Sequence, residues 1–530
     1  MKKDIKFNVF VSIVRTLTLT LVSFLTFPYV SSTLGDNYLG AYTWANTFVY
    51  FFLILARISI PNIAVRECVK VKDDKVELAR KTKLFFVMQL ITTALSFVSL
   101  LVIVLTIPGV RNMNQEILGE NGMGNLIFIL SINFLAGVFS FEWLYTALEK
   151  HFYMAVRSII AMAISSILIF SFIRYKEHVY IYSLFTVGVT IITVISNLIF
   201  LPKYIHFKGV GIASPKPYFR PILTMLLITI VLAIYNEGDM LLLGIMDAKK
   251  SETGAHTIAM RGIEIIITVI TSLNMVFMPR ASDYVVKGEE EKYNELVKYS
   301  MNLCFFIAIP AIATMVGTSE TITALISGNG NVSREFLITA EQLEEFEMHF
   351  EEGKAFANAW IILCFLSPLM LTYSIGDIIY TQVLIPYKKE RTYLIVLGIA
   401  TILMLGFSAL LGLTFFKAVP GLGVAISVGA MDIFAFILLF VLTKNKTRKA
   451  IFNLNNLKIV VVGVIIGVFT FFVGPIIRNA LYQANNDFVA SLLLELVIMV
   501  LIDALIYIGT LYILKENLVR DLLHFRRKSS

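Results

Sequence analysis

The sequence predicts an all-α polytopic membrane protein with fourteen transmembrane helices. Hydrophobic residues make up 57% of the 530-residue chain, and Asp, Glu, Lys and Arg make up only 15%. A soluble domain usually has ~25% charged residues. Apolar segments of about 20 residues recur along the whole chain, each long enough to cross a hydrocarbon layer as a helix. Such runs exclude a porin-type barrel, whose strands alternate apolar and polar residues.

The fourteen candidate spans are separated by polar or charged connectors. The first span follows Met1-Lys2-Lys3-Asp4, the kind of basic flank found in signal peptides, but its apolar stretch is too long for one and contains Arg15. We therefore expect a retained first span. The spans cover residues 7–30, 41–63, 84–108, 125–148, 157–173, 179–201, 221–244, 255–279, 301–317, 357–384, 392–416, 422–442, 458–477 and 488–514.

Lys and Arg concentrate in every second connector. With the N-terminus in the cytoplasm, 33 of the 45 basic residues fall on cytoplasmic segments, an excess typical of membrane proteins. An odd number of spans would abolish this asymmetry, so we expect a multi-pass protein with both termini cytoplasmic. The net charge of +8 then belongs to the cytoplasmic face, where anionic lipid explains it and no nucleic-acid partner is expected.

Two stretches share the order Leu-Gly, connector, Gly-Ala, helix, Pro and basic loop. They begin at Leu34-Gly35 and Leu243-Gly244, six spans apart and hence on the same side of the membrane. This repeat predicts two six-helix lobes in parallel orientation, followed by two further helices. The expected parts are an N-terminal lobe at 1–204, a cytoplasmic linker at 205–220, a C-terminal lobe at 221–443, the last two spans within 444–514 and a basic cytoplasmic tail at 515–530.

A long acidic segment at 318–356 separates the ninth and tenth spans. Thr339-Ala340-Glu341-Gln342 has the spacing of a helix capping box, and Leu343, Phe346 and Phe350 follow at helical spacing. We expect a short amphipathic helix on the outer surface, serving either as a lid without a role in transport or as a substrate gate.

Several short motifs occur in a characteristic order between Pro28 and Ala425. The motifs are Pro28-Tyr29 with Leu34-Gly35, Tyr38 and Gly40-Ala41-Tyr42; Phe141-Glu142-Trp143-Leu144-Tyr145 with Glu149; Glu237-Gly238-Asp239 with Leu242-Leu243-Gly244; Met278-Pro279-Arg280-Ala281-Ser282; Gln382-Val383-Leu384-Ile385-Pro386 with Lys388-Lys389-Glu390-Arg391; and Gly421-Leu422-Gly423-Val424-Ala425. Together they resemble the polysaccharide (Wzx-type) flippases of O-antigen, capsule or teichoic-type pathways, in the multidrug/oligosaccharidyl-lipid/polysaccharide exporter superfamily. The Gly-x-x-Arg-Asp signature of lipid II flippases is absent around Arg15.

The resemblance implies a V-shaped pair of lobes around a central cavity, in the cytoplasmic membrane of a bacterium. It also implies movement of an undecaprenyl-diphosphate-linked oligosaccharide from the inner to the outer leaflet by alternating access, for cell-surface polysaccharide biosynthesis. The expected partners are this lipid-linked substrate, bilayer lipids, and a polymerase and glycosyltransferases of the same pathway.

Arg15, Arg57 and Arg261 lie within predicted spans one, two and eight. A charge in hydrocarbon costs at least ~3 kcal/mol unless it has a partner or a wet cavity. Because a guanidinium can bind phosphate oxygens bidentately, the three arginines are candidates for binding the substrate's diphosphate or sugar. The alternatives are that Arg15 and Arg57 snorkel to the membrane surface and that Arg261 pairs with Glu264, three residues further along the same helix.

Acidic residues within the spans form a second set of candidates, either for coupling to Na⁺ or H⁺ or for intramembrane salt bridges. Gly238 lies between two of them and predicts a kink. Two others, in the last span, are spaced to share a helix face that forms either a groove for the lipid tail or a packing seam. The cavity or ion-coupling candidates are Glu142, Glu237, Asp239, Glu264 and Asp377, and the lipid-groove candidates are Glu495 and Asp503.

The sequence favours a transporter over an enzyme, and we expect no catalytic residue, resident cofactor or metal. No Gly-x-x-x-x-Gly-Lys-Ser/Thr loop occurs, so direct use of ATP by this chain is not expected. Two alternatives remain: an ion-coupled multidrug or metabolite exporter with the same fold, and a membrane polysaccharide polymerase or acyltransferase. Arginines lining a cavity would repel a cationic drug and favour an anionic lipid as cargo.

Overall fold

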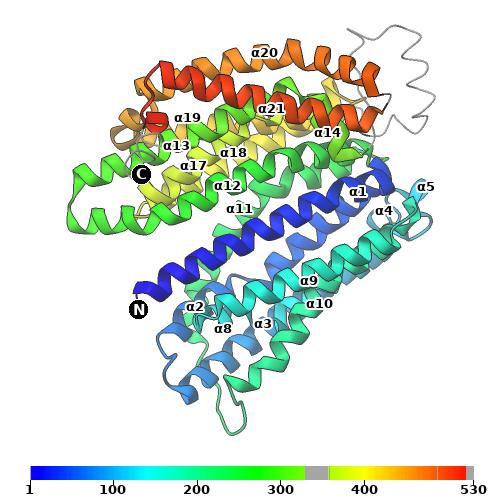
Figure 1. Cartoon of the computed structure of the whole chain (residues 1–530). Helices are drawn as coiled ribbons and strands as arrows, with labels where there is room; N and C mark the ends of the chain where they lie inside the picture. The colour runs from blue at the N-terminus through cyan, green and yellow to red at the C-terminus, as the bar shows by residue number, and fades with distance from the viewer. Residues whose placement is uncertain (1, 329–355, 357, 486, 521–530) are drawn as a thin grey trace. The chain divides into compact units, whose positions relative to one another are not determined.

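The computed structural model describes residues 2–328, 356, 358–485 and 487–520, which contain helices and no β-strand (Figure 1). These residues form two compact units, Met1–Gly254 and Ala255–Ser530. Each unit is a bundle of helices.

Within the described residues, 13 helical segments are long and apolar enough to cross a membrane. The first of them, Val11–Arg57, has 47 residues. An unbroken helix of that length would extend for about 70 Å, more than twice the thickness of the hydrocarbon layer. It is interrupted at Gly35, whose φ of 72° and ψ of 174° are not helical and favour glycine. Predicted spans one and two are therefore the two halves of this interrupted helix. Counted separately, they turn the 13 segments into fourteen spans, and the prediction of fourteen spans is confirmed.

The first unit contains every element from α1 to α11 and the beginning of α12. Helix α9 packs against both α1 and α10 (Figure 1). Predicted span four is built from three successive short helices, α6 to α8. The elements are α1 (Lys2–Arg57), α2 (Ile60–Val69), α3 (Lys75–Thr106), α4 (Pro108–Arg111), α5 (Gln115–Leu118), α6 (Gly122–Ser131), α7 (Asn133–Phe139), α8 (Glu142–Ala147), α9 (His151–Phe172), η1 (Lys176–His178), α10 (Val179–Phe200), η2 (Leu201–Lys203), η3 (Lys216–Tyr218) and α11 (Phe219–Met246).

Helices α1 and α11 approach each other closely because small residues occupy their interface. Trp44 of α1 is 1% exposed, and its indole Nε1 donates a hydrogen bond of 3.1 Å to the carbonyl oxygen of Leu241 in α11. A Cβ atom at Gly244 would overlap the indole ring. One at Gly40 would overlap the backbone oxygen of Lys250, just beyond α11. Larger residues at either glycine would separate these segments.

This packing explains why the boundary between the compact units follows Gly254 and not the predicted linker at 205–220. Helix α11 contacts α1 and therefore belongs to the first unit, although it begins the second sequence repeat. The predicted division into lobes, a last pair of spans and a tail describes the repeat and stays a prediction.

In the second unit, α13 and α21 both pack against α20, and α18 packs against α19 (Figure 1). The predicted outer segment begins with α14, in which eight of nine residues are buried, so this part is not a solvated loop. The amphipathic helix expected near Leu343 lies outside the described residues. The elements are α12 (Ser251–Lys287), α13 (Glu290–Gly317), α14 (Ser319–Ser327), α16 (Ala359–Leu366), α17 (Leu369–Ile378), η4 (Ile379–Leu384), α18 (Glu390–Leu410), η5 (Leu411–Phe415), α19 (Pro420–Ile451), α20 (Leu454–Asn485) and α21 (Phe488–Ile513).

Glu67 of α2 links three elements of the first unit. One carboxylate oxygen accepts a hydrogen bond of 2.5 Å from Lys70, and the other accepts bonds from Lys81 of α3 at 2.9 Å and from the Tyr218 hydroxyl of η3 at 3.3 Å. The hydrogen bond from Lys70, supported by the one from Lys81, lowers the pKa of Glu67 to about 2. The ionised carboxylate therefore stabilises the folded state.

We predict that Glu67→Gln lowers the melting temperature of the purified protein at pH 7, and that this difference narrows as the pH falls. Since the folded pKa is about 2 and the unfolded one 4.5, the stabilisation is complete above about pH 4.5 and is lost as the pH falls towards 2. Thermal unfolding of both proteins between pH 7 and pH 3 measures the effect. The exposed Glu120 provides a control, because Glu120→Gln should change little at any pH. A difference between Glu67→Gln and wild type that does not vary with pH would contradict this account.

Candidate functional site

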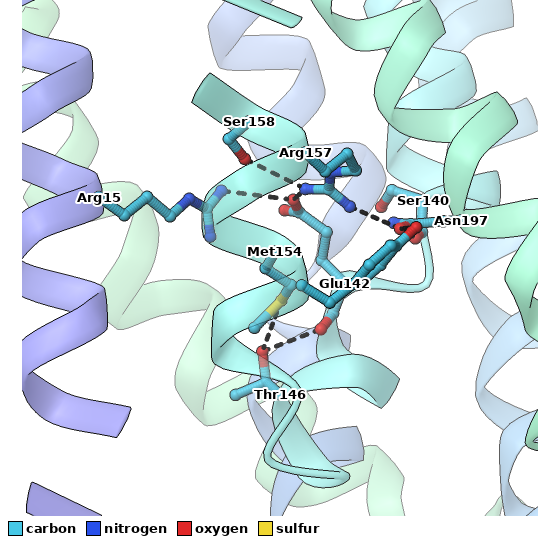
Figure 2. A network of polar contacts seen from close by, with 9 residues as sticks. Arg15, Ser140, Glu142, Thr146, Met154, Arg157, Ser158 and Asn197 are labelled. Carbon is cyan, nitrogen blue, oxygen red and sulfur yellow. Dashed lines mark hydrogen bonds and ion pairs between the residues drawn. The ribbon is translucent and has the colours of Figure 1, made fainter. Parts of the chain in front are cut away.

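A cluster of charged and polar side chains joins α1, α8, α9 and α10 in the first unit. Glu142 lies in the first turn of α8, immediately after Phe141, whose backbone is left-handed with φ 47°. Its Oε1 lies 2.5 Å from Nη2 of Arg157 on α9 and 3.6 Å from Nη2 of Arg15 on α1. Figure 2 shows the Glu142 carboxylate between the two guanidinium groups. One carboxylate is thus shared by two arginines from different helices.

Asn197 of α10 holds Arg157 in place from the side opposite α1. Arg157 is nearly buried, and its Nη1 donates a hydrogen bond of 2.6 Å to Oδ1 of Asn197. The same oxygen accepts a 3.1 Å bond from the Tyr153 hydroxyl, and Nδ2 of Asn197 donates to the carbonyl oxygen of Ser140 (Figure 2). Asn197 is fully buried, and its backbone oxygen accepts a 2.6 Å bond from the Tyr145 hydroxyl. These bonds fix the orientation of the Arg157 guanidinium.

The three charged groups of the cluster differ in accessibility. The side chain of Arg157 is only 4% exposed, whereas that of Glu142 is 43% exposed and that of Arg15 is 28% exposed. Two guanidiniums and one carboxylate leave one positive charge in excess. The longer contact belongs to the accessible Arg15, so Arg15 is the less neutralised of the two guanidiniums.

Arg57 is the last residue of α1, and its side chain is exposed. The helix ends there because Ile58 and Ser59 have φ values of 42° and 55°, which β-branched residues such as isoleucine rarely adopt. The Ser59 hydroxyl lies 2.7 Å from that of Thr229, which anchors the break to α11. Arg57 therefore lies beside a discontinuity in the second span.

Arg261 lies in the second unit and pairs with Glu264. Its Nη1 is 2.7 Å from Oε2 of Glu264, three residues further along α12. The sequence predicts this ion pair as the alternative to contact with the substrate. The side chains of both residues are substantially exposed, at 39% and 52%. Some of the charge of Arg261 is thus neutralised on its own helix.

The remaining ion-coupling candidates lie in α11 and α17. Glu237 is half-buried and Asp239 is buried. Helix α11 continues through Gly238, so the kink predicted there does not interrupt the helix. Asp377 of α17 is half-buried and accepts a hydrogen bond of 2.9 Å from Asn274 of α12. No group of three metal-binding side chains occurs within the described part of the chain.

Glu495 and Asp503 of α21 are both buried between helices. Glu495 accepts a 2.7 Å hydrogen bond from Thr321 of α14, and Asp503 accepts bonds of 2.6 Å from Thr314 of α13 and 2.8 Å from Thr470 of α20. An apolar cavity of about 440 Å³ lies between α13 and α20, and neither carboxylate lines it. Both residues occupy packing seams, and a role beside the lipid tail stays a prediction.

The sequence does not single out Arg157 and Asn197. The predicted fifth span begins at residue 157, which assigns Arg157 to the cytoplasmic surface, whereas α9 begins at His151 and carries Arg157 almost two turns into the helix. The clue in the sequence is that Arg157 and Asn197 are strongly polar residues in otherwise apolar segments, each directly beside a serine.

We predict that Asn197→Leu destabilises the protein by about 2 kcal/mol, because it leaves buried hydrogen-bonding groups of Arg157 and Ser140 unsatisfied. Asn125 of α6 is exposed and provides a matched control, since Asn125→Leu should have little effect. Thermal or denaturant unfolding of both variants in detergent measures the difference. Equal stabilities of the two variants would show that the Asn197 bonds do not support the cluster.

The sequence matches the family described as polysaccharide biosynthesis protein over residues 5–285. It is 20% identical over 398 residues to the "Putative O-antigen transporter" of Escherichia coli (strain K12), a match that covers 73% of this chain and 85% of the relative.

Solved structures with a similar fold are those of transporters. Lipid II flippase MurJ, in an inward closed conformation, gives a TM-score of 0.69 at 17% identity, covering 96% of this chain and 99% of that one. An inward-facing multidrug resistance MATE family transporter of the MOP superfamily gives 0.57 at 14% identity, covering 82% and 96%. The family match extends over more than half of the chain and includes the whole cluster around Glu142. The chain therefore belongs to the polysaccharide biosynthesis protein family, as its motifs predict, and it has the fold of MOP-superfamily transporters.

Proposed function

We propose that this protein moves an undecaprenyl-diphosphate-linked oligosaccharide from the inner to the outer leaflet of a bacterial cytoplasmic membrane by alternating access. Family membership and a fold shared with flippases support transport, not catalysis, as its activity. The observation that carries the choice of substrate is the excess positive charge of the cluster formed by Arg15, Glu142 and Arg157.

The cluster suits a diphosphate because it can exchange one anion for another. A guanidinium binds phosphate oxygens with two parallel hydrogen bonds, and Arg15 is accessible enough to do so. When Arg15 turns from Glu142 to the phosphate, Glu142 keeps its 2.5 Å contact with Arg157. Binding therefore leaves Glu142 paired with Arg157, so no unpaired carboxylate remains beside the negative charges of the substrate. Release of the phosphate restores the original pair, so the exchange is reversible.

The other arginines and the acidic residues extend this proposal. Arg57 and Arg261 are further candidates for contact with the diphosphate or sugar, although Glu264 moderates the charge of Arg261. Glu237, Asp239 and Asp377 are proposed sites for coupling to Na⁺ or H⁺. Glycosyltransferases would supply the cargo, and a polymerase would consume it.

The same fold in a multidrug transporter supports a second candidate, export of a small cationic compound in exchange for an ion. A cationic cargo needs an excess of carboxylates, whereas the cluster around Glu142 has an excess of guanidiniums. The charge balance favours the anionic lipid.

We predict that Arg15→Glu reduces cell-surface polysaccharide at least about tenfold in cells lacking the chromosomal copy, because one charge-assisted contact becomes a repulsion. Arg15→Lys should retain part of the activity, since it keeps the charge but loses the bidentate geometry. The measurements are surface polysaccharide and accumulated lipid-linked oligosaccharide, both normalised to the amount of protein in the membrane.

Arg80→Glu provides the matched control. Arg80 pairs with Glu77 on the exposed surface of α3 at 2.8 Å, so its reversal changes the net charge equally without touching the cluster. Full export by Arg15→Glu, at a normal protein level, would refute the assignment of this site. Loss of export in both variants would show that overall charge, and not the cluster, is responsible.

A further inference from the structure

A basic cavity lies in the first unit, and the residues that line it are not those of the cluster around Glu142. It has a volume of about 790 Å³, within the range of small-molecule sites. One wall is formed by α2 and the residue that follows it, with Ile63, Arg66, Glu67 and Lys70 at helical i, i+3, i+4 and i+7 spacing. The opposite wall is the turn that leads into α11 and includes Tyr218.

The cavity lies where two membrane-spanning helices meet the membrane surface. Helix α2 follows directly after the span that ends at Arg57, and the opposite wall lies at the first residues of the span Lys216–Met246. Basic residues are numerous in this region, which the charge distribution predicts to be cytoplasmic. The cavity is thus at the level of lipid headgroups.

The charges around the cavity do not balance. Glu67 is engaged on both carboxylate oxygens by Lys70, Lys81 and Tyr218. Arg66 is exposed, and no ion pair of Arg66 occurs among the described residues. Arg66 and Lys70 are two cations against the single carboxylate of Glu67 in the lining, which leaves one positive charge in excess. The side chain of Lys70 is 66% exposed. An anionic group can therefore approach both Arg66 and Lys70.

Apolar residues complete the lining and narrow the class of ligand. Val65 and Val69 of α2 flank the basic residues, and Pro217 and Pro221 lie on the other wall. A small hydrophilic phosphate compound would leave these apolar surfaces in contact with water. A phosphate group attached to hydrocarbon would satisfy both the cations and the apolar walls.

We propose that this cavity binds the headgroup of an anionic phospholipid, with its phosphate at Arg66 and Lys70 and the start of its hydrocarbon against the valine and proline surfaces. The site is separate from the transport cluster and does not depend on the identity of the cargo.

Native mass spectrometry of the purified full-length protein tests this proposal with phosphatidylglycerol and phosphatidylcholine as probes. In the double variant Arg66→Gln/Lys70→Gln, the affinity for phosphatidylglycerol should fall roughly 30-fold, as expected for the loss of two surface charges near a lipid headgroup. Binding of phosphatidylcholine should be weak in the wild type and unchanged by the substitutions. Arg66→Gln alone leaves the Glu67 bonds intact and should weaken binding about fivefold.

Lys72→Gln/Arg80→Gln is the matched control, because it removes the same charge from residues that pair with Glu149 and Glu77 outside the cavity. Retention of phosphatidylglycerol binding in this control would support the site. Equal loss in both double variants would overturn it in favour of general surface charge. Inorganic pyrophosphate raising the melting temperature as much as phosphatidylglycerol would also overturn it, because the ligand would then be a soluble phosphate compound.

Discussion

The sharing of one carboxylate, Glu142, by two guanidiniums is the interaction on which this account of the protein depends. Charge is expensive inside a membrane, so an arginine persists there only with a partner, a wet cavity or a ligand. Arg157 has permanent partners in Glu142 and Asn197, at 2.5 and 2.6 Å. Arg15 has only the longer contact of 3.6 Å to the same carboxylate. The incomplete neutralisation of Arg15 turns a structural salt bridge into a candidate anion site.

A group of buried charges in the second unit holds helices together. In the second unit, Arg478 of α20 lies 3.5 Å from Glu320 of α14 and 4.0 Å from Glu495 of α21, and all three side chains are nearly buried. These contacts tie three helices where apolar packing alone gives little preference for one helix pairing over another in lipid. By contrast, the cluster around Glu142 and the cavity beside Arg66 have more cations than carboxylates. We assign ligands to these two sites because of that excess.

The sequence was sufficient for features that depend on local pattern and insufficient for those that depend on distant partners. The length of the apolar segments and the distribution of Lys and Arg predicted the helical spans. The i,i+3 spacing predicted the ion pair of Arg261 and Glu264. The cluster joins residues from four helices, and nothing in their separate neighbourhoods indicates that Arg157, Asn197 and Glu142 meet. Because α9 begins at His151, earlier than expected, the predicted boundaries placed Arg157 at the membrane surface and not within the helix. Hydropathy likewise could not show that Gly35 interrupts one long helix.

The affinity of Glu142→Gln for inorganic pyrophosphate, measured by calorimetry on the purified protein, tests the central claim most directly. If Glu142 competes with an anion for Arg15, its neutralisation should tighten binding at least about fivefold, since a unit charge 3.6 Å away contributes ~1 kcal/mol even at the dielectric constant of water. Arg15→Gln should weaken binding, and the double variant should bind as weakly as Arg15→Gln alone. Unchanged or weaker binding by Glu142→Gln would contradict the exchange of anions at Arg15.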